Sequence, residues 1–452
     1  MKIARAPVRP PATMPSDPRY YDERDLEAEL KRTFQVCHDC RMCVNYCGAF
    51  PELFARLDRD IDAGRAEGAE LLGHDDFRAV SEQCWQCKLC YIKCPYTGDE
   101  DSYELLDFPR LMAREKAAHA RRNGVKMVDR VLGEPQLVGA YASGWRAGPS
   151  NLIQASRLLR KVQEKATGVS AEFPLPSFSS KPFMEWMRKH RPAESAGEAG
   201  EVVLFATCYG QFNMPSVPRA AVLVLERLGY AVRTIDETCC GMPNLDGGDV
   251  DAARKKIAHN VQALLPHVRA GCQVLVPGAT CGYTMKREWH EYVDAPASLA
   301  GEVREVSAAV FDVMEFLELL RRDKRLPKAE GEGLGRVAYQ VPCHLRAQKI
   351  GFPAARVLEK ALPETEVEII QECSAVDGTW GMKAAHYETG RKYAQKMVAA
   401  IDESEADVVV SDCSLSMLRI AKETGTPAIH PIEALARGWG LIDSGDRPTE
   451  EA

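Results

Sequence analysis

The sequence lacks any apolar run close to the ~20 residues that a membrane-spanning helix needs. The run AAVLVL at residues 220–225 is typical of its longest apolar stretches. The N-terminal stretch MKIARAPVRPPATMP also lacks the apolar core of a secretory signal. These absences predict a cytoplasmic protein. They do not exclude peripheral contact with the inner face of a membrane.

The sequence also lacks a basic stripe and a nucleotide-binding fingerprint. Its formal net charge is −7, which argues against nucleic acid as a partner. NLDGGDVD at 244–251 does not have the spacing of a dinucleotide loop, and GEGLG at 331–335 lies in a charged linker rather than after a strand. We therefore expect any flavin that works with this protein to be bound by another chain.

Cysteine is abundant, with 16 among 452 residues. In a long chain without a secretory signal, clustered cysteines bind metal more often than they form disulfides. The length suits two or three domains, and the composition is that of a globular protein.

Composition and periodicity divide the chain into five parts. Leu26, Leu30 and Phe34 form a helical stripe before the first cysteines. Strand-like runs alternate with helix-like runs after residue 201, which indicates parallel α/β units. The predicted parts are an N-terminal extension (1–30), a segment with two cysteine groups (31–105), a mainly helical connecting segment (106–200) and two α/β units (201–327 and 336–445).

Two cysteine groups near the N-terminus share the spacing C-x2-C-x2-C-x3-C, in CHDCRMCVNYC and CWQCKLCYIKCP. In two-cluster ferredoxins, the fourth cysteine of each such run binds the other cluster. Zinc is the competing interpretation, but structural zinc prefers paired C-x2-4-C ligands. The spacing therefore predicts two [4Fe-4S] clusters, one held by Cys37, Cys40, Cys43 and Cys94 and the other by Cys84, Cys87, Cys90 and Cys47.

The 36 residues between Cys47 and Cys84 are mainly helical in pattern, over residues 52–72. This favours a helical two-cluster domain over a compact β-rich ferredoxin. Four other polar residues lie between the predicted ligands: His38, Arg41, Lys88 and Lys93. Two roles stay open for them, solvation of the surface or an increase in cluster potential through charge and hydrogen bonding.

The second half of the chain is an internal repeat. Cys208 and Cys343 are 135 residues apart, and Cys281 and Cys413 are 132 apart. The cysteines of ETCCGMP and QECSAVDGTWG follow the same offset, and strand-like runs precede most of these positions. The chain is therefore predicted to be α+β and multidomain, with a helical two-[4Fe-4S] ferredoxin-like domain followed by a duplicated α/β cysteine-rich domain.

The two copies differ in their thiols. The first copy has Cys208, Cys239, Cys240 and Cys281, which we predict to hold metal, with buried structural cysteines as the alternative. The second copy retains Cys343, Cys373 and Cys413, with Ser374 in place of the second adjacent cysteine. Two alternatives stay open for this copy. It holds a cluster with one open iron, which water, substrate, Ser374 or His344 would complete, or its site is no longer used. Cys272 has no counterpart and is expected in the core.

The duplicated pattern, Cys-x(n)-CCG-x(n)-C-x-x-C, resembles the cysteine-rich domain of heterodisulfide reductase B subunits. With the two ferredoxin runs upstream, the chain from about Thr33 to Leu441 resembles the iron–sulfur C subunits of anaerobic glycerol-3-phosphate dehydrogenases. Iron–sulfur subunits of glycolate and lactate oxidation share this layout. The chain departs from the pattern at Thr284, Ser374 and Ser416, where a cysteine would stand. The resemblance implies a further iron–sulfur centre in the first copy and leaves the second copy open.

The resemblance implies an electron-transfer subunit. Electrons would pass between a flavin-dependent dehydrogenase or other redox protein and a quinone or membrane-associated acceptor. The alternative is a catalytic disulfide or heterodisulfide-type reductase that acts at the cysteine-rich domain, and the missing cysteines weigh against it. A third interpretation is a sensor or scaffold whose clusters only stabilise the fold, and the two matched runs weigh against a purely structural role.

Overall fold

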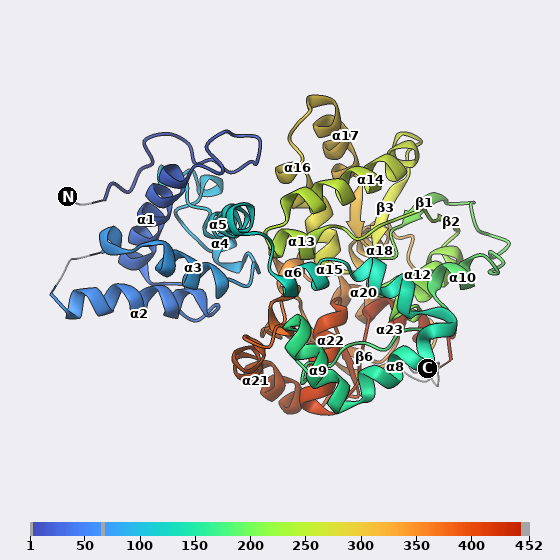
Figure 1. Ribbon diagram of the computed structural model, residues 1–452. Helices are drawn as coiled ribbons and strands as arrows, with labels where there is room; N and C mark the ends of the chain where they lie inside the picture. The colour runs from blue at the N-terminus through green and yellow to red at the C-terminus, as the bar shows by residue number, and fades with distance from the viewer. Residues whose placement is uncertain (1–2, 65–67, 444–452) are drawn as a thin grey trace.

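The computed structural model describes residues 3–64 and 68–443. Residues 1–2 of the predicted extension, 65–67 of the predicted helical insert and 444–445 of the second unit lie outside the described residues. Figure 1 shows a helical N-terminal part beside a body made of two α/β units. None of the described helices is long and apolar enough to cross a membrane.

The N-terminal part is helical, as the sequence predicts. Its elements are α1 (Glu23–Cys40), α2 (Ala49–Asp62), η1 (Ala69–Leu71), α3 (His74–Glu82), α4 (Leu89–Ile92), η2 (Gly98–Glu100) and α5 (Phe108–Asn123). The side chain of Asp22 caps α1 by accepting a hydrogen bond from the Asp25 amide. The predicted stripe of Leu26, Leu30 and Phe34 is buried in the core of this part.

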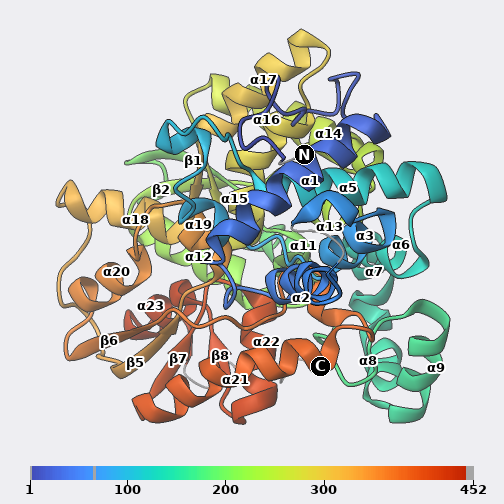
Figure 2. The ribbon, with the colours of Figure 1, turned by 90° about the vertical axis from the view of Figure 1, so that its left-hand side faces the viewer.

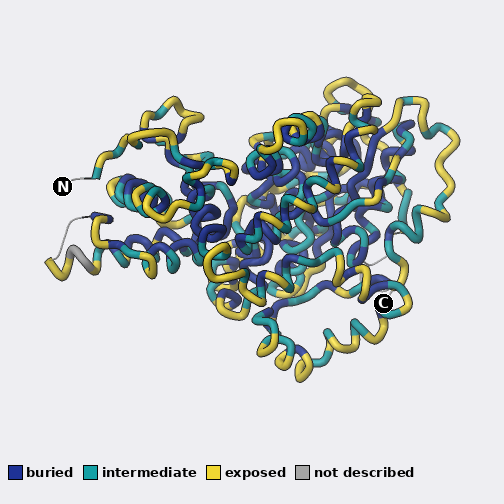
Figure 3. Tube along the Cα trace, turned by 45° about the horizontal axis from the view of Figure 1, so that its top comes forward, coloured by how far each residue is buried: buried dark blue, intermediate teal, exposed yellow. Residues whose placement is uncertain are grey.

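The connecting segment is a series of short helices. They are α6 (Met127–Leu132), α7 (Pro135–Ala142), η3 (Gly144–Arg146), α8 (Ala147–Ala155), α9 (Arg157–Thr167) and α10 (Phe183–Met187). Figures 1 and 2 both show α8 and α9 side by side at the edge of the body. Figure 3 shows burial concentrated inside the body and exposure along its outer segments.

The first α/β unit contains a four-stranded parallel sheet in the order β2-β1-β3-β4. Its strands are β1 (Gly200–Leu204), β2 (Tyr230–Arg233), β3 (Gln273–Val276) and β4 (Val310–Asp312). Its helices are α11 (Cys208–Phe212), α12 (Ser216–Arg227), α13 (Met242–Asp246), α14 (Val250–Arg269), α15 (Ala279–Tyr283), the π-helix η4 (Thr284–Glu288), α16 (Trp289–Tyr292), α17 (Ala297–Ala308) and α18 (Val313–Arg322).

The second unit repeats this topology, with a parallel sheet in the order β6-β5-β7-β8. Its strands are β5 (Gly335–Gln340), β6 (Thr365–Ile370), β7 (Val408–Val410) and β8 (Ala428–Ile429). Its helices are α19 (Cys343–Ala347), α20 (Pro353–Ala361), η5 (Trp380–Met382), α21 (Tyr387–Ser404), α22 (Ser414–Thr424) and α23 (Pro431–Gly438). The equal strand order supports the duplication inferred from the cysteine offsets.

One hydrophobic core joins the two units. Helix α12 of the first unit packs against α23 of the second, and α18 packs against α20. Because α12 corresponds to α20 and α18 to α23, this is the reciprocal contact expected of two copies related by an approximate twofold axis. Leu317 and Leu358 are fully buried in it, and burial of such a side chain stabilises the fold by about 1.5–3 kcal/mol.

The topology places the cysteine loops at one edge of each sheet. In the second unit, Cys343, Cys373 and Cys413 each come three residues after the end of β5, β6 and β7. Cys208, Cys239 and Cys281 come four, six and five residues after the ends of β1, β2 and β3. Since the carboxyl ends of parallel strands share one edge of the sheet, each unit gathers its cysteines in one place.

Candidate functional site

The first cysteine run winds around the end of α1. Helix α1 stops at Cys40 because Arg41 adopts a left-handed conformation, with φ of 51°, and its amide donates to the Cys37 carbonyl at 2.8 Å. The chain then turns back, and Cys37, Cys40 and Cys43 line a small cavity. The fourth cysteine at this cavity is Cys94, from the second run.

The second run turns through Gln86 and Lys88, which also have positive φ. Burial, and then the charges of Cys87, Cys47 and Cys84, raise the pKa of Cys90 well above its ordinary value. Cys47, from the first run, therefore lies with the three leading cysteines of the second run. The structure thus places Cys94 with the three leading cysteines of the first run, and Cys47 with those of the second.

The two crossed sets adjoin one another at Tyr46. Burial and the nearby charges of Cys43, Cys90 and Cys87 raise the pKa of the Tyr46 hydroxyl. Cys43 belongs to the first set and the other two cysteines to the second. His38, at the outer end, interacts with Arg41 at 2.9 Å rather than with a cysteine.

The first α/β unit brings its four thiols into a single group. Cys208 interacts with Cys239, Cys239 with Cys240, and Cys240 with Cys281. These interactions lower the pKa of Cys239 well below its usual value, while they and burial raise the pKa of Cys208 and Cys240. Cys272, as predicted, is buried in the core and outside this group.

Distant residues hold the adjacent cysteines in their irregular turn. The Trp289 ring nitrogen donates to the Cys240 carbonyl at 2.9 Å, and the Asn260 amide donates to the Cys239 carbonyl at 3.2 Å. Gly241 follows in the left-handed region, with φ of 93°, where a side chain would be strained. Sequence reasoning did not find Trp289 or Asn260, because neither lies near a cysteine motif.

The second α/β unit has a smaller thiol group. The Cys343 thiol donates to the Cys373 sulfur at 3.9 Å, and the Ala375 amide donates to the same sulfur at 3.2 Å. The hydroxyls of Ser374 and Ser416 hydrogen-bond to each other at 2.9 Å. The Ser416 side chain also interacts with Cys413. Both serines therefore lie at the site.

His344 does not face the cysteine group beside it. Its Nδ1 atom lies 3.1 Å from the Thr280 hydroxyl, in the first unit, and its Nε2 atom lies 3.0 Å from the Gln86 carbonyl, in the second ferredoxin run. Its ring also stacks on that of Tyr283 at 5.1 Å. With both nitrogens engaged, His344 joins three parts of the chain, and the hypothesis that it replaces a thiol ligand is not supported.

A buried ion pair at the same junction was not predicted from the sequence. Lys88, between two predicted cluster ligands, contacts Glu288 of the first unit at 2.7 Å. Burial opposes the charge on Lys88, but Glu288 and nearby tyrosines raise its pKa well above the ordinary value. A second pair, Lys116 with Asp246 at 3.2 Å, joins α5 to the first unit. The helical part is therefore fixed against the body by buried charges.

The thiol groups follow one another through the molecule. Burial, and then the charges of Asp377, Cys47 and Cys373, raise the pKa of Cys87 well above its ordinary value. The second ferredoxin set therefore borders the thiols of the second unit. Cys413 of that unit lies in turn on one pocket with all four thiols of the first unit.

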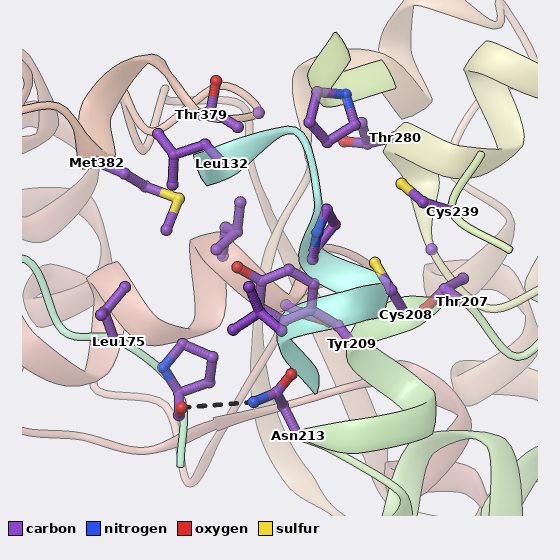
Figure 4. A pocket seen from close by; sticks show the side chains of 18 of the residues that line it. Leu132, Leu175, Thr207, Cys208, Tyr209, Asn213, Cys239, Thr280, Thr379 and Met382 are labelled. Atoms are coloured by element: carbon purple, nitrogen blue, oxygen red, sulfur yellow. Dashed lines mark hydrogen bonds between the residues drawn. The ribbon is translucent and has the colours of Figure 1, made fainter. Parts of the chain in front are cut away.

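This pocket is largely apolar. One wall carries Cys208, Cys239, Cys240, Cys281 and Cys413, and the opposite wall is formed by α6–α9 and residues 175–178. Figure 4 shows the Tyr209 hydroxyl directed into it, between Leu175 and Cys208. Burial and the charges of Cys208, Cys413 and Cys239 raise the pKa of this hydroxyl. A flat apolar molecule in the pocket would therefore lie beside the thiols.

The described residues contain no group of three or more His, Cys, Asp or Glu side chains arranged around a single metal ion. An iron–sulfur cubane is larger than an ion, and its four thiolates stand correspondingly apart. Each of the two cysteine sets offers four thiols, and thiolates are the donors that such clusters use.

Comparison with known proteins agrees with this organisation. Residues 202–286 and 337–419 match the family model of the cysteine-rich domain (CCG). The duplicated cysteine-rich domain predicted from the sequence is therefore confirmed.

The chain is similar to iron–sulfur subunits of oxidoreductases. It is 26% identical to the C subunit of anaerobic glycerol-3-phosphate dehydrogenase from Escherichia coli K12, over 68% of this chain and 76% of that protein. It is 24% identical to the glycolate oxidase iron–sulfur subunit of the same strain, over 91% and 95%. The B subunit of fumarate reductase (CoM/CoB) from Methanothermobacter marburgensis is 24% identical, over 78% and 71%. The resemblance inferred from the motifs is confirmed.

Proposed function

We propose that this chain is the electron-transfer subunit of an oxidoreductase complex, and that it carries electrons from a flavin-dependent dehydrogenase to a quinone. The contiguity of the thiol groups is the observation that carries the proposal. They run from the outer cavity at Cys94, through Cys90 and Cys87, to Cys343, and then to the pocket at Cys413.

Two [4Fe-4S] clusters fit the ferredoxin sets, and a further iron–sulfur centre fits the four thiols of the first unit. When bound, such clusters accept and release electrons. The proposed ligands are Cys37, Cys40, Cys43 and Cys94 for one cluster, Cys84, Cys87, Cys90 and Cys47 for the next, and Cys208, Cys239, Cys240 and Cys281 for the third. Cys343, Cys373 and Cys413 would hold an incomplete site.

The surroundings of the second set suit a conducting role. Its thiols are buried, so water is kept from them. The Gln86 side-chain amide donates to the Cys84 sulfur at 3.3 Å. A hydrogen bond to sulfur favours the reduced, more negative cluster, and so raises its potential.

The alternative, a catalytic disulfide or heterodisulfide-type reductase, finds less support. Thr284 stands where the first copy would end in a second cysteine, and its hydroxyl bonds to Glu288 at 3.1 Å rather than to the thiol group. The second copy lacks two thiols. Such a reductase would need full cysteine sets, and neither copy has one.

Anaerobic purification of the tagged chain from its native cell tests the proposal. We expect a flavin-containing dehydrogenase to copurify, and the substrate of that enzyme to reduce the iron–sulfur centres in a single turnover. A preparation with full iron content, in which no copurified flavoprotein reduces the centres, would contradict the assignment.

A further inference from the structure

A cavity of about 290 Å³, here called the junction cavity, lies where the four parts of the chain meet. Helices α3 and α5 of the N-terminal part line it, together with Asp129 and Gly168 of the connecting segment, Asp246 of the first unit and residues 383–386 of the second. A single water needs only about 10–15 Å³, so the cavity has room for a ligand of several atoms. It shares no lining residue with the apolar pocket beside the thiols.

Charged side chains make up more than half of the lining of the junction cavity. Four are basic and three are acidic: Arg78, Lys116, Lys126 and Lys383, with Glu82, Asp129 and Asp246. Arg78 and Lys126 both contact the single carboxylate of Glu82. Arg78 also contacts Glu115 at 3.5 Å, but Glu115 is not part of the lining. Basic groups therefore outnumber carboxylates around the cavity.

Two of the lysines keep donors for a ligand. An ammonium group has three N–H donors. Among the described residues, the Lys126 ammonium contacts one carboxylate, that of Glu82, and the Lys383 ammonium contacts one, that of Asp129 at 2.7 Å. The Lys126 side chain is 47% exposed, so it stands at the entrance of the cavity, where a ligand would arrive from solvent.

His386 adds a buried polar atom without a partner. Its residue is 6% exposed and lines the cavity, and its Nδ1 atom has no hydrogen-bond partner among the described residues. The ring is held in place by stacking on Trp380, with the ring centroids 4.5 Å apart. Burial, and then the charge of Lys383, lower the pKa of His386 to about 4. A bound ligand would satisfy a polar group that is otherwise costly to bury.

The N-terminal end of α21 borders the same cavity. This helix has 18 residues, His386 is its N-cap, and no described side chain caps its first turn. The amide groups and the dipole at such an end favour negative charge. Positive groups thus approach the cavity both from the N-terminal part, through Arg78 and Lys126, and from the second unit, through Lys383 and α21. A ligand with two negative charges suits this arrangement.

The floor of the cavity contacts the second cysteine run. The Lys116 ammonium donates to the Cys84 carbonyl at 3.3 Å and also contacts Asp246 at 3.2 Å. The side chains of Lys116 and Asp246 are 8% and 3% exposed, so little water screens charges at this depth. Negative charge near a cluster disfavours its reduced, more negative state. An anion in the cavity would therefore lower the potential of a cluster held by the second set.

We propose that the junction cavity binds a small dianion whose charge lies on oxygen atoms, such as phosphate or a dicarboxylate, and that the bound anion makes the second cluster harder to reduce. The binding stands on the cavity itself, whereas the effect on the cluster rests on the proposed function. Coupling between two equilibria is reciprocal, so reduction of the cluster weakens anion binding by the same factor. The cavity would in this way let an anionic metabolite regulate electron transfer through the chain.

Calorimetric titration of the anaerobically purified holoprotein at fixed ionic strength tests the binding, with inorganic phosphate and succinate as separate probes. We expect one site per chain for at least one probe, and the probe that binds distinguishes a phosphate from a dicarboxylate site. Lys126→Glu should weaken binding about tenfold, because a charged hydrogen-bond donor at the entrance is lost. His386→Phe keeps a ring against Trp380 but has no ring nitrogen, and should also bind several-fold more weakly.

The control Lys360→Glu reverses the charge of an exposed lysine of α20, which does not line the cavity, and should bind like the parent. Absence of binding for both probes, or parental affinity in either Lys126→Glu or His386→Phe, would overturn the site.

The coupling is measured by repeating the titration on photochemically reduced holoprotein. We expect the reduced protein to bind the anion about fivefold or more weakly than the oxidised protein. Cys47→Ser, which removes a proposed ligand of the second cluster, should bind it equally in both states. Equal affinity of the oxidised and reduced parent would overturn the coupling. Reduction of the centres by the copurified flavoprotein is scored in the same samples, so failure of the electron-transfer proposal is visible independently of anion binding.

Discussion

The hydroxyl oxygens of Ser374 and Ser416 lie 2.9 Å apart in a buried site. The two serines stand at two positions where the resembled pattern has cysteines, one in the adjacent pair and one after Cys413. Their mutual hydrogen bond satisfies two buried polar groups that would otherwise be costly. The second unit therefore has a hydrogen-bonded pair of hydroxyls at two positions where the resembled pattern has thiols.

The Ser374→Cys/Ser416→Cys variant should bind additional iron. Two further thiols would join Cys343, Cys373 and Cys413 and give the second unit a cysteine set at least as large as that of the first. We expect more iron and sulfide per chain after anaerobic reconstitution, and a new or altered EPR signal after reduction.

Ser404→Cys is the matched control, because it places a thiol at a buried serine of α21 that is hydrogen-bonded to the Ile401 carbonyl. It should leave iron content unchanged. Equal iron in the double variant and this control would show that the second unit does not bind a cluster.

Because each proposed cluster takes ligands from both cysteine runs, a single cysteine substitution should remove one cluster and leave the other. Cys94→Ser should abolish the cluster of the first run and spare that of the second, although Cys94 belongs to the second run in sequence. Cys47→Ser should do the opposite. EPR of the reduced variants, with iron analysis, distinguishes the two. Cys272→Ser is the control, since Cys272 is buried outside every group. Loss of the same signal in both ligand variants would contradict the crossing.

The grouping of the cysteines could be predicted because the sequence patterns that indicate it are local. The C-x2-C-x2-C-x3-C spacing lies in one stretch, and the offset between copies reflects a repeated βαβ topology that returns each cysteine loop to the same sheet edge. The partners that fix these loops could not be predicted. Trp289 reaches Cys240, and Lys88 reaches Glu288, only because helices far apart in sequence pack together. The partner of a single lysine or tryptophan cannot be predicted from a sequence pattern.

His344 shows the same limit. Its position beside Cys343 made it a reasonable substitute ligand, but its ring orientation is set by Thr280 and Gln86. We predict that His344→Asn keeps the parental iron content and EPR spectrum while lowering the free energy of unfolding by about 1–3 kcal/mol, since buried hydrogen bonds are lost. Urea titration measures the stability change. A selective loss of iron from the second unit would instead identify His344 as a ligand.

The Lys88–Glu288 pair should be strongly coupled. Glu288→Gln leaves the buried Lys88 ammonium without its counter-charge, which typically costs about 3–5 kcal/mol. The double variant Lys88→Met/Glu288→Gln removes the orphaned charge and should recover much of this loss. A double-mutant cycle by urea unfolding measures the coupling. Additive effects of the two substitutions would mean that the pair does not hold the helical part to the body.

Asp246 should make the stability of the protein dependent on acid pH. Burial alone would raise its pKa, but Lys116, Lys383 and the Thr379 hydroxyl together lower the pKa to about 2. A carboxyl whose pKa is lower in the folded state than in the unfolded chain, where it is about 3.9, contributes stability at higher pH. This contribution disappears as the pH falls from about 4 to about 2.

Asp246→Asn should be less stable than the parent at pH 7. Because the variant lacks this part of the acid dependence, the difference in the free energy of unfolding between the two proteins should narrow as the pH falls from 4 to 2. Urea unfolding at several pH values measures it. Asp236→Asn is the control, because the Asp236 side chain is 98% exposed. A constant difference between Asp246→Asn and the parent across this range would show that Asp246 is not held as a buried, paired carboxylate.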